Sequence, residues 1–546
     1  MEKIALIDWI ICAAYLFLIV GLGVYFSNKQ KGNDDFFLGG KNMHWMPVGL
    51  SLFATTFSSN SFVGLPAEGA YRDYHQLLAI FFIPFVVIPI TCYWFIPFYK
   101  SLPFDSLYEY LERRFNRSVR LLASIIFMIY SAGWMGTMLL AVSRILNVVL
   151  DTDGELIERQ LLAVQAAAGA PAAIAQELSA IENELRSQTI FIIVITGILA
   201  TAYTAMGGVK AVIWTDTVQA FALGGGMIFL FTLLLGQIDG GWETFLNVGT
   251  ENNKFSMSRT DGGLAERNIF SACVYGFFVY MGGQLASYGA FQRYITVDSV
   301  RDARRALAIK GTFTFVVCTL FFLVGTALFV FYQQSHADVF AGLSHGKLKD
   351  QLLPHFVVNF AGGYGMVGLL LAGLFAAAMS SLDSGINSMS ASLVTDWFRG
   401  KEFGTKVNRL LTFFLGILVT GFACLLSLID HPVFEILISI AGATLGLLLG
   451  VLMMGMLLKR VNATGVIFGM VAGLATFFLI RFWIPALSDE ALLKIGAFAG
   501  LKNNTWWDGV FTTMPAILVA ITVSAFTAPP RPEQLQGLLL SSQKSR

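Results

Sequence analysis

The stretch Ser51-Leu-Phe-Ala-Thr-Thr-Phe-Ser-Ser-Asn-Ser-Phe-Val63 carries six polar side chains within seven consecutive positions, 55–61, although it lies inside an apolar segment. Hydroxyl and amide groups at membrane depth are costly unless they find partners, and non-helical backbone is tolerated there only where it lines a cavity or is buried in protein. One or two such residues would be typical of a close helix interface. Six of them, followed by Gly64 and Pro66, indicate an interrupted helix that lines a site.

The composition around this stretch is that of a polytopic membrane protein. The 546 residues are 56% hydrophobic and only 13% charged, whereas soluble proteins are about a quarter charged. Segments of about 20 apolar residues are long enough to span a bilayer, and about thirteen occur, which predicts an all-α integral membrane protein. They lie near 5–27, 46–71, 77–99, 120–150, 189–206, 211–236, 268–290, 308–333, 363–395, 406–428, 431–457, 462–484 and 509–528.

Several function classes find no support in the sequence. The net charge of +1 is not gathered on one basic face, so we expect no nucleic-acid partner. All five cysteines fall in apolar segments and all six histidines lie in loops or at segment ends. Neither a His-Glu-x-x-His nor a Cys-x-x-Cys spacing occurs, and no phosphate-binding Gly-x4-Gly-Lys-Ser/Thr loop occurs. The pattern therefore disfavours a disulfide framework, a histidine or cysteine metal site, ATP as an energy source and an intramembrane enzyme.

Lysine and arginine gather in alternate connections, which include those around 29–41, 100–120, 293–305, 399–406 and 459–460. Because positively charged loops are retained in the cytoplasm, we expect the N-terminus outside and the C-terminus inside. The first segment lacks a basic region and a small-residue cleavage site, so it is expected to be a retained helix.

A soluble, alanine-rich insertion at 151–187 separates two of the apolar segments. Apolar residues at helical spacing run from Ile157 to Ala168 and from Ile174 to Leu185, with Gly169-Ala-Pro171 between them. This pattern predicts an extracytoplasmic helical hairpin whose two seams pack on each other.

A second polar group lies in Gly373-Leu-Phe-Ala-Ala-Ala-Met-Ser-Ser-Leu-Asp-Ser-Gly-Ile-Asn-Ser388. Helical spacing places Ala377, Ser380, Ser381 and Ser384 on one face, with Asp383 at its margin. A tight helix interface of small residues is the alternative interpretation. The carboxylate favours a site for a small, hard cation that takes oxygen ligands.

Asp216, in Trp214-Thr-Asp216, is a further acid near the start of its segment. It fits a site and a solvated or helix-capping residue equally well.

A third polar region, Met281-Gly-Gly-Gln-Leu-Ala-Ser-Tyr-Gly289, interrupts another apolar segment. It falls in the fifth segment after the first interrupted one. Two five-helix halves, 46–236 and 268–457, therefore each begin with a broken helix, as an inverted repeat with a central site would. The remaining parts are a leading helix and loop at 1–45, an extracytoplasmic loop at 237–267, and two accessory helices with a short tail at 458–546.

Five motifs resemble those of the sodium-solute symporter family, which includes sodium-glucose, sodium-proline, sodium-iodide, monocarboxylate and sialic acid symporters. They are Asp35-Phe-Phe-Leu-Gly-Gly-Lys41, Ser106-Leu-Tyr-Glu-Tyr-Leu-Glu-Arg-Arg-Phe115, Gly207-Gly-Val-Lys-Ala-Val-Ile-Trp-Thr-Asp216, Gln292-Arg-Tyr294 and Ala377-Ala-Met-Ser-Ser381. The resemblance covers nearly the whole chain except 151–187. It implies a fold like that of the bacterial leucine transporter, with five plus five inverted helices, one preceding helix and two following helices.

The resemblance also implies sodium sites. The site shared by the family would use backbone carbonyls and hydroxyls of Ala54, Phe57, Ala377, Ser380 and Ser381. A second site, present in members that couple two sodium ions, would use Asp216, Ser380, Asp383 and Ser384. Asp383 departs from the family pattern, where serine or threonine is more usual, and this departure could strengthen cation binding, admit a proton or rearrange the site.

Substrate contacts carried over from the family fall on nine residues. They are Thr56, Ser58, Ser59, Ser61, Gln76, Trp134, Gln284, Ser287 and Tyr288. In the sialic acid members an arginine that holds the substrate carboxylate aligns with Trp134, so its absence argues against sialic acid. A tryptophan face with hydroxyls suits a sugar or polyol, and it also accepts a small carboxylate or anion.

These observations predict a plasma-membrane secondary transporter, in the inner membrane of a Gram-negative cell, that imports a small polar solute with sodium by alternating access. Two sodium ions are expected, and no obligate protein partner is evident. The alternative is a transporter-like sensor that acts through a partner protein.

Overall fold

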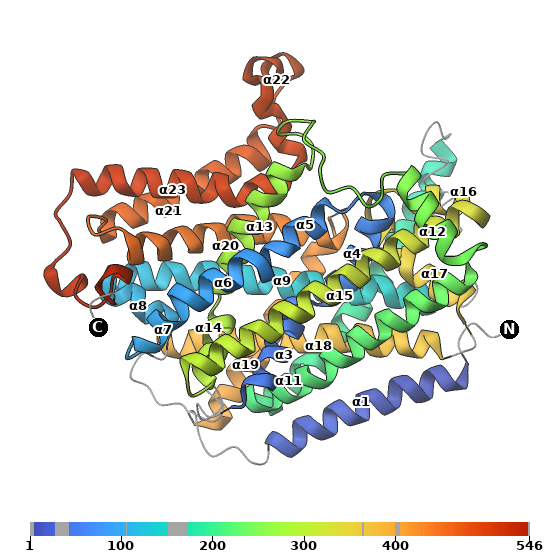
Figure 1. Cartoon of the computed structure of the whole chain (residues 1–546), viewed down its shortest axis with the longest axis horizontal. Coiled ribbons are helices and arrows are strands. Elements are labelled where there is room, and N and C mark those ends of the chain that lie inside the picture. Colours follow the sequence, from blue (N-terminus) through green and yellow to red (C-terminus); the bar gives the residue numbers. More distant parts are fainter. Residues whose placement is uncertain are drawn as a thin grey trace.

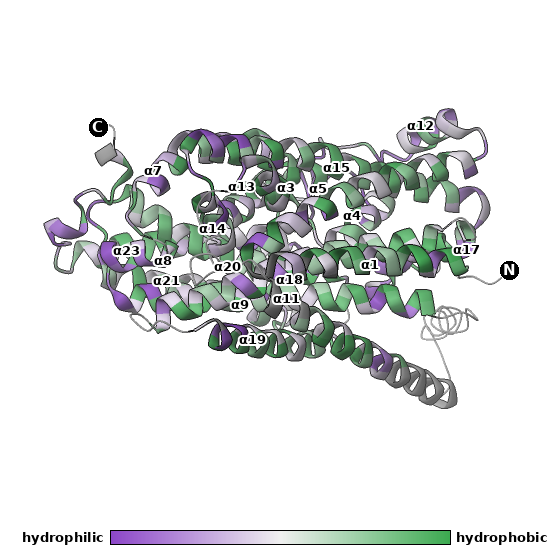
Figure 2. Ribbon diagram, turned by 90° about the horizontal axis from the view of Figure 1, so that it is seen from below, coloured by the Kyte–Doolittle hydropathy of each residue, from purple (hydrophilic) through white to green (hydrophobic). Residues whose placement is uncertain are grey.

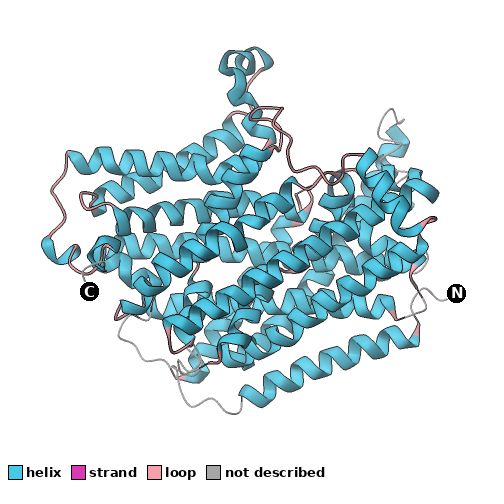
Figure 3. Ribbon diagram, in the orientation of Figure 1, coloured by secondary structure: helices cyan, strands magenta, loops and turns pink. Residues whose placement is uncertain are grey.

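The computed structural model describes residues 5–27, 43–104, 106–150, 172–362, 365–398, 404–429 and 431–543. Within these ranges every regular element is a helix, and most of the helices run side by side in one bundle (Figures 1 and 3). Ten of the described helical spans are long and apolar enough to cross a membrane, and the bent pair α13–α14 makes an eleventh. With α1 and the interrupted pair α3–α4 counted as spans, the number fits the thirteen expected.

The outer helices carry the apolar surface that a bilayer requires. Figure 2 shows hydrophobic residues along α1 (Leu6–Ser27) and α19 (Thr405–Leu426). Phe17 on α1 is 79% exposed and Leu410 on α19 is 68% exposed. Large apolar side chains this exposed on long helices are stable only in lipid, so the chain is a multi-pass membrane protein.

The first polar stretch interrupts a helix, as predicted. Helix α3 (Trp45–Thr56) ends where Phe57 and Ser58 adopt extended backbone, and α4 (Ser59–Tyr71) begins directly after them. The break leaves the last carbonyls of α3 and the first amides of α4 without partners in their own helices. Ser59, Asn60 and Ser61 at the start of α4 are all buried.

The second interruption lies between α13 (Ile269–Leu285) and α14 (Tyr288–Thr296), which are bent by 54°. Before the break, Gly282 lies so close to α20 that a Cβ there would meet the Leu445 carbonyl oxygen at 2.5 Å. The glycine therefore allows α13 to pack against α20 (Val433–Leu457) just before the chain bends.

The helix that carries the second polar group, α18 (Met366–Ser392), lies in the centre of the bundle. It packs against α1, α3, α9 (Arg117–Leu150), α11 (Ala172–Gln237) and α19. Ser380, Ser381, Asp383 and Ser384 are at most 3% exposed. The polar face of α18 therefore meets protein and not lipid.

The other helices complete the bundle and its connections. They are α5 (His75–Phe82), which continues through π-helical turns to Ser101, α8 (Leu107–Arg114), α12 (Gly241–Glu251), α15 (Val300–Ser335), α16 (Ala337–Gly342), α17 (Leu352–Phe360), α21 (Ala463–Phe478), α22 (Asp489–Ile495) and α23 (Asp508–Ala525).

Part of the predicted insertion lies outside the described residues. Residues 151–171 belong to this part, and so does the motif at 35–41. Residues 172–187 are helical, and they form the beginning of α11.

Three arginines in the connections that the sequence assigns to the cytoplasm are buried, so they are not the solvated loop residues that the count of basic residues assumes. Arg114, Arg120 and Arg293 are 0%, 2% and 1% exposed. Arg114 donates to the carbonyl oxygens of Gly455 and Leu458, whereas Arg120 and Arg293 form ion pairs with buried aspartates. Counting basic residues in loops treats each as solvated, and the count cannot recognise one that protein groups satisfy.

Candidate functional site

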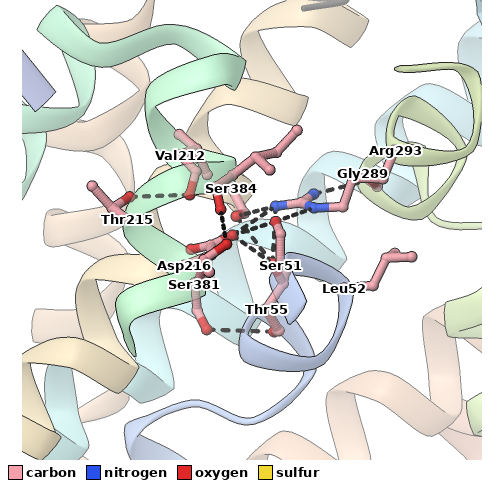
Figure 4. Close-up of polar contacts among 12 residues, drawn as sticks. Ser51, Leu52, Thr55, Val212, Thr215, Asp216, Gly289, Arg293, Ser381 and Ser384 are labelled. Atoms are coloured by element: carbon pink, nitrogen blue, oxygen red, sulfur yellow. Dashed lines mark hydrogen bonds and ion pairs between the residues drawn. The ribbon is translucent and has the colours of Figure 1, made fainter. Parts of the chain in front are cut away.

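Four helices bring their polar residues together around Asp216, which lies on α11 (Figure 4). Ser51 Oγ, on α3, donates a hydrogen bond to Asp216 Oδ2 at 2.5 Å. Arg293, on α14, places Nη2 3.3 Å from the same oxygen and donates from Nε to Ser51 Oγ at 2.8 Å. Asp216 is fully buried, so the interpretation of this acid as a solvated helix-end residue is excluded.

Arg293 is held on several sides and joins α14 to α18. Its Nη2 donates to Ser384 Oγ at 2.5 Å and to Thr55 Oγ1 at 2.9 Å, and its Nη1 donates to the Gly289 carbonyl at 3.1 Å. The positive charge of Arg293 is thus compensated by Asp216, and most of its N–H groups have partners.

Three oxygens expected in the second sodium site have no hydrogen-bond partner among the residues that the structure describes. They are Asp216 Oδ1, Ser380 Oγ and Asp383 Oδ2. Asp383 receives a hydrogen bond from Thr204 of α11 at its other oxygen. Unsatisfied buried carboxylate and hydroxyl oxygens are costly unless something binds them, and a cation that prefers oxygen ligands fits this set.

Ser384, the fourth residue expected in that site, is engaged differently. Its hydroxyl accepts the hydrogen bond from Arg293 and lies 3.1 Å from Thr55 Oγ1.

The residues expected to form the shared sodium site meet where α3 ends. Ala54, Phe57, Ala377 and Ser380 line one small space between α3 and α18. Ser381 Oγ donates to the Thr55 carbonyl at 3.4 Å (Figure 4). Because α3 stops at Thr56, carbonyls of its last turn have no amide donors within the helix. The break therefore offers backbone oxygens beside the serine hydroxyls of α18.

A larger cavity of about 130 Å³ lies against this cluster. At roughly 10–15 Å³ for each water-sized sphere, the volume has room for a small organic solute. Thr55, Arg293 and Ser384 belong to both the cluster and the cavity wall. Tyr130 and Trp134 of α9 also line the cavity, and their rings stack with centroids 5.8 Å apart and planes at 9°.

Thr56, Trp134, Gln284 and Ser287, four of the nine residues expected to contact substrate, line this cavity. The other five, Ser58, Ser59, Ser61, Gln76 and Tyr288, lie outside the lining.

Two of those five residues, Gln76 and Tyr288, contact side chains that line the cavity. Ser59 Oγ donates to the Met138 carbonyl, and Gln76 Nε2 donates to the hydroxyl of Tyr280, which does line the cavity. The ring of Tyr288 packs between those of Tyr108 and Phe127, while Ser58 and Ser61 are buried beside the helix break.

Sequence reasoning missed two basic residues of the cavity wall, Arg293 and Lys310. Arg293 belongs to a recognised motif, but it was counted among the loop residues. Lys310 of α15 lies at the third position of a segment expected to span the membrane, 308–333. A charge just inside an apolar segment was the available signal.

Comparison with known proteins identifies a family. The model of the sodium:solute symporter family matches residues 36–169 and 172–473. The sodium/sialic acid symporter SiaT of Proteus mirabilis is 28% identical over 97% of both chains, and human sodium-coupled monocarboxylate transporter 1 is 28% identical over 87% of this chain and 73% of its own.

Solved structures give the same result. A substrate-bound, outward-open sodium-coupled sialic acid symporter aligns with a TM-score of 0.76 and 27% identity, covering 96% of this chain and 99% of its own. The transporter MhsT, in complex with L-phenylalanine, shares the fold at a TM-score of 0.50 and 15% identity. The family model covers most of the chain, and the chain belongs to the sodium:solute symporter family.

Proposed function

We propose that this protein imports a small polar solute together with sodium ions by alternating access. The position of Thr55 is the observation that carries the proposal. Its carbonyl accepts from Ser381 beside the shared sodium site, its hydroxyl contacts Ser384 and Arg293, and it lines the solute cavity. The end of α3 thus contributes both to the shared sodium site and to the wall of the solute cavity. We expect binding at one site to affect the other through this helix end.

Two sodium ions are proposed for each solute. The first takes carbonyls of α3 with Ser380 and Ser381. The second takes Asp216, Ser380 and Asp383, each of which has one side-chain oxygen without a hydrogen-bond partner among the described residues. Ser384 completes the second site when Arg293 leaves. With an uncharged solute, two charges crossing a membrane potential supply about 4.6 kcal/mol per 100 mV, which corresponds to roughly three decades of accumulation.

The proposal includes the arrangement in the membrane. The two halves, 46–236 and 268–457, would form inverted repeats that move relative to each other around the broken helices. The protein would lie in the plasma membrane, or the inner membrane of a Gram-negative cell, with its N-terminus outside and its C-terminus in the cytoplasm.

Transport by the purified protein in proteoliposomes tests this function. Uptake from a panel of radiolabelled sugars, carboxylates and amino acids is compared in sodium and in choline medium at equal ionic strength. Ser381→Ala should abolish sodium-dependent uptake of whichever solute is taken up. Ser390→Ala is the matched control, because Ser390 is a buried serine of the same helix that contacts Thr412 and not the site.

Uptake that is the same in choline would refute sodium coupling. Sodium-dependent solute binding without uptake would instead favour the sensor.

A further inference from the structure

We propose that the solute is a small organic monocarboxylate and that Lys310 binds its carboxylate. The proposal rests on the transport function proposed above and names the chemical class of its substrate. Lys310 projects from α15 into the wall of the solute cavity and is 6% exposed.

The ammonium group of Lys310 has one hydrogen-bond partner among the described residues. Its Nζ donates to Gln284 Oε1 at 2.6 Å. No described carboxylate forms an ion pair with it, and the lining of the cavity contains neither aspartate nor glutamate. An ammonium group has three N–H donors, so the protein leaves Lys310 with donors and a positive charge to offer.

The other cation of the cavity wall is already compensated. Arg293 is paired with Asp216 and bound to Ser51, Thr55 and Ser384. Protonated Lys310 therefore gives the cavity wall one positive charge that no carboxylate of the lining compensates. Burying an uncompensated charge is costly, and a ligand with one negative charge removes this cost.

Two of the polar side chains that could bind a sugar are already engaged within the protein. Gln284 is committed at both ends of its amide, to Lys310 through Oε1 and to the Tyr294 hydroxyl through Nε2. Thr56 donates its hydroxyl to the Leu52 carbonyl. Gln284 therefore positions Lys310 and has little capacity to bind solute hydroxyls.

The rest of the cavity suits an apolar body attached to the carboxylate. Tyr130 and Trp134 present a stacked aromatic surface, and Phe127, Val279 and Leu445 also line the space. A volume of about 130 Å³ is too large for a single halide ion to fill. One anionic end and an apolar body together describe a small monocarboxylate.

Wild-type protein provides a test that needs no mutation. Thermal unfolding and competition uptake are measured in sodium with matched pairs of probes: propionate against propionamide, and phenylacetate against phenylacetamide. Glucose and iodide complete the set. The carboxylates should stabilise the protein, whereas the neutral amides, glucose and iodide should have no effect at equal concentration. Equal protection by an amide, or protection by glucose or iodide alone, would overturn the proposal.

A variant then assigns the carboxylate to Lys310. Lys310→Met keeps the length of the side chain and removes its charge. It should bind the carboxylate probes about 10–100-fold more weakly, the loss expected for a charge-assisted hydrogen bond. Thr314→Val is the matched control, because Thr314 is a buried polar residue one turn along α15 and outside the cavity lining. Wild-type carboxylate affinity in Lys310→Met would contradict the assignment.

The outcomes separate this inference from the function on which it rests. Sodium-dependent uptake of a neutral solute would sustain the symporter and refute the carboxylate. Carboxylate uptake that does not depend on sodium would sustain the role of Lys310 and refute the symporter.

Discussion

Replacing Asp383 by asparagine should weaken sodium binding and remove its cooperativity without unfolding the protein. The side chain is 1% exposed, one oxygen accepts a hydrogen bond from Thr204, and the other has no hydrogen-bond partner within the described part of the chain. Among the described residues no basic side chain forms an ion pair with Asp383. In the proposed two-sodium mechanism, the second sodium ion compensates this carboxylate.

The size of the effect follows from that isolation. Interactions with a charged partner contribute about 1.5–3 kcal/mol, and about 1.4 kcal/mol corresponds to a factor of ten in affinity. Asp383→Asn should therefore raise the half-saturating sodium concentration about 10–150-fold and lower the Hill coefficient from above one to one. Asparagine can still accept the hydrogen bond of Thr204, so stability without sodium should be unchanged or higher.

The assay is solute uptake against sodium concentration in proteoliposomes, with choline keeping ionic strength constant, together with thermal unfolding in sodium-free buffer. Asp396→Asn is the control, because Asp396 is a buried carboxylate at the end of the same helical span but is paired with Arg120 at 2.7 Å. The control should lower the unfolding temperature and leave the Hill coefficient unchanged. Wild-type half-saturation and cooperativity in Asp383→Asn would show that Asp383 binds no ion.

Three further predictions concern other parts of the protein. Asp216→Asn should lower the sodium Hill coefficient towards one while uptake through the shared site remains detectable, and unaltered cooperativity in sodium titrations of uptake would contradict this. The same substitution should lower the unfolding temperature because Arg293 loses its carboxylate partner. Replacing 151–187 by a short Gly-Ser linker should leave tracer uptake near the wild-type level, and a loss of uptake with normal membrane insertion would show a role in gating or assembly. Arg144→Met should lower the free energy of unfolding by about 3–5 kcal/mol, because it leaves Asp350 as an unpaired buried charge. Asp350 lies 2.5 Å from Arg144 and is 1% exposed. Thermal unfolding should show that adding Asp350→Leu restores much of the lost stability.

The interruptions of the helices could be predicted from the sequence because they have a local cause. Six polar residues at 55–61 cannot face lipid, and glycines with polar residues at 281–289 cannot form an ordinary span. The structure breaks α3–α4 and α13–α14 at these two places. The lengths of the apolar segments likewise predict the approximate membrane spans, because the thickness of a bilayer sets the length of a helix that crosses it.

The partners within the site could not be predicted in the same way, since they depend on contacts between residues far apart in the chain. Arg293 and Asp216 are separated by 77 positions, and only the folded bundle brings them together. The sequence assigns Arg293 to a loop because it shows the charge of this residue and not the partner. Lys310 was missed for a related reason: the third position of an expected span is where a lysine ordinarily extends its ammonium group to the membrane surface. The structure instead turns it towards Gln284 and the cavity.

Simultaneous measurement of charge and solute movement in voltage-clamped proteoliposomes tests the central claim, sodium-coupled import, most directly. With an inward sodium gradient, the account predicts that the solute accumulates above its external concentration and that two sodium ions enter with each solute molecule. Accumulation should stop when the sodium gradient is dissipated or when potassium replaces sodium. Solute uptake that is equal in potassium, or that moves no net charge with an anionic solute and sodium present, would contradict the account.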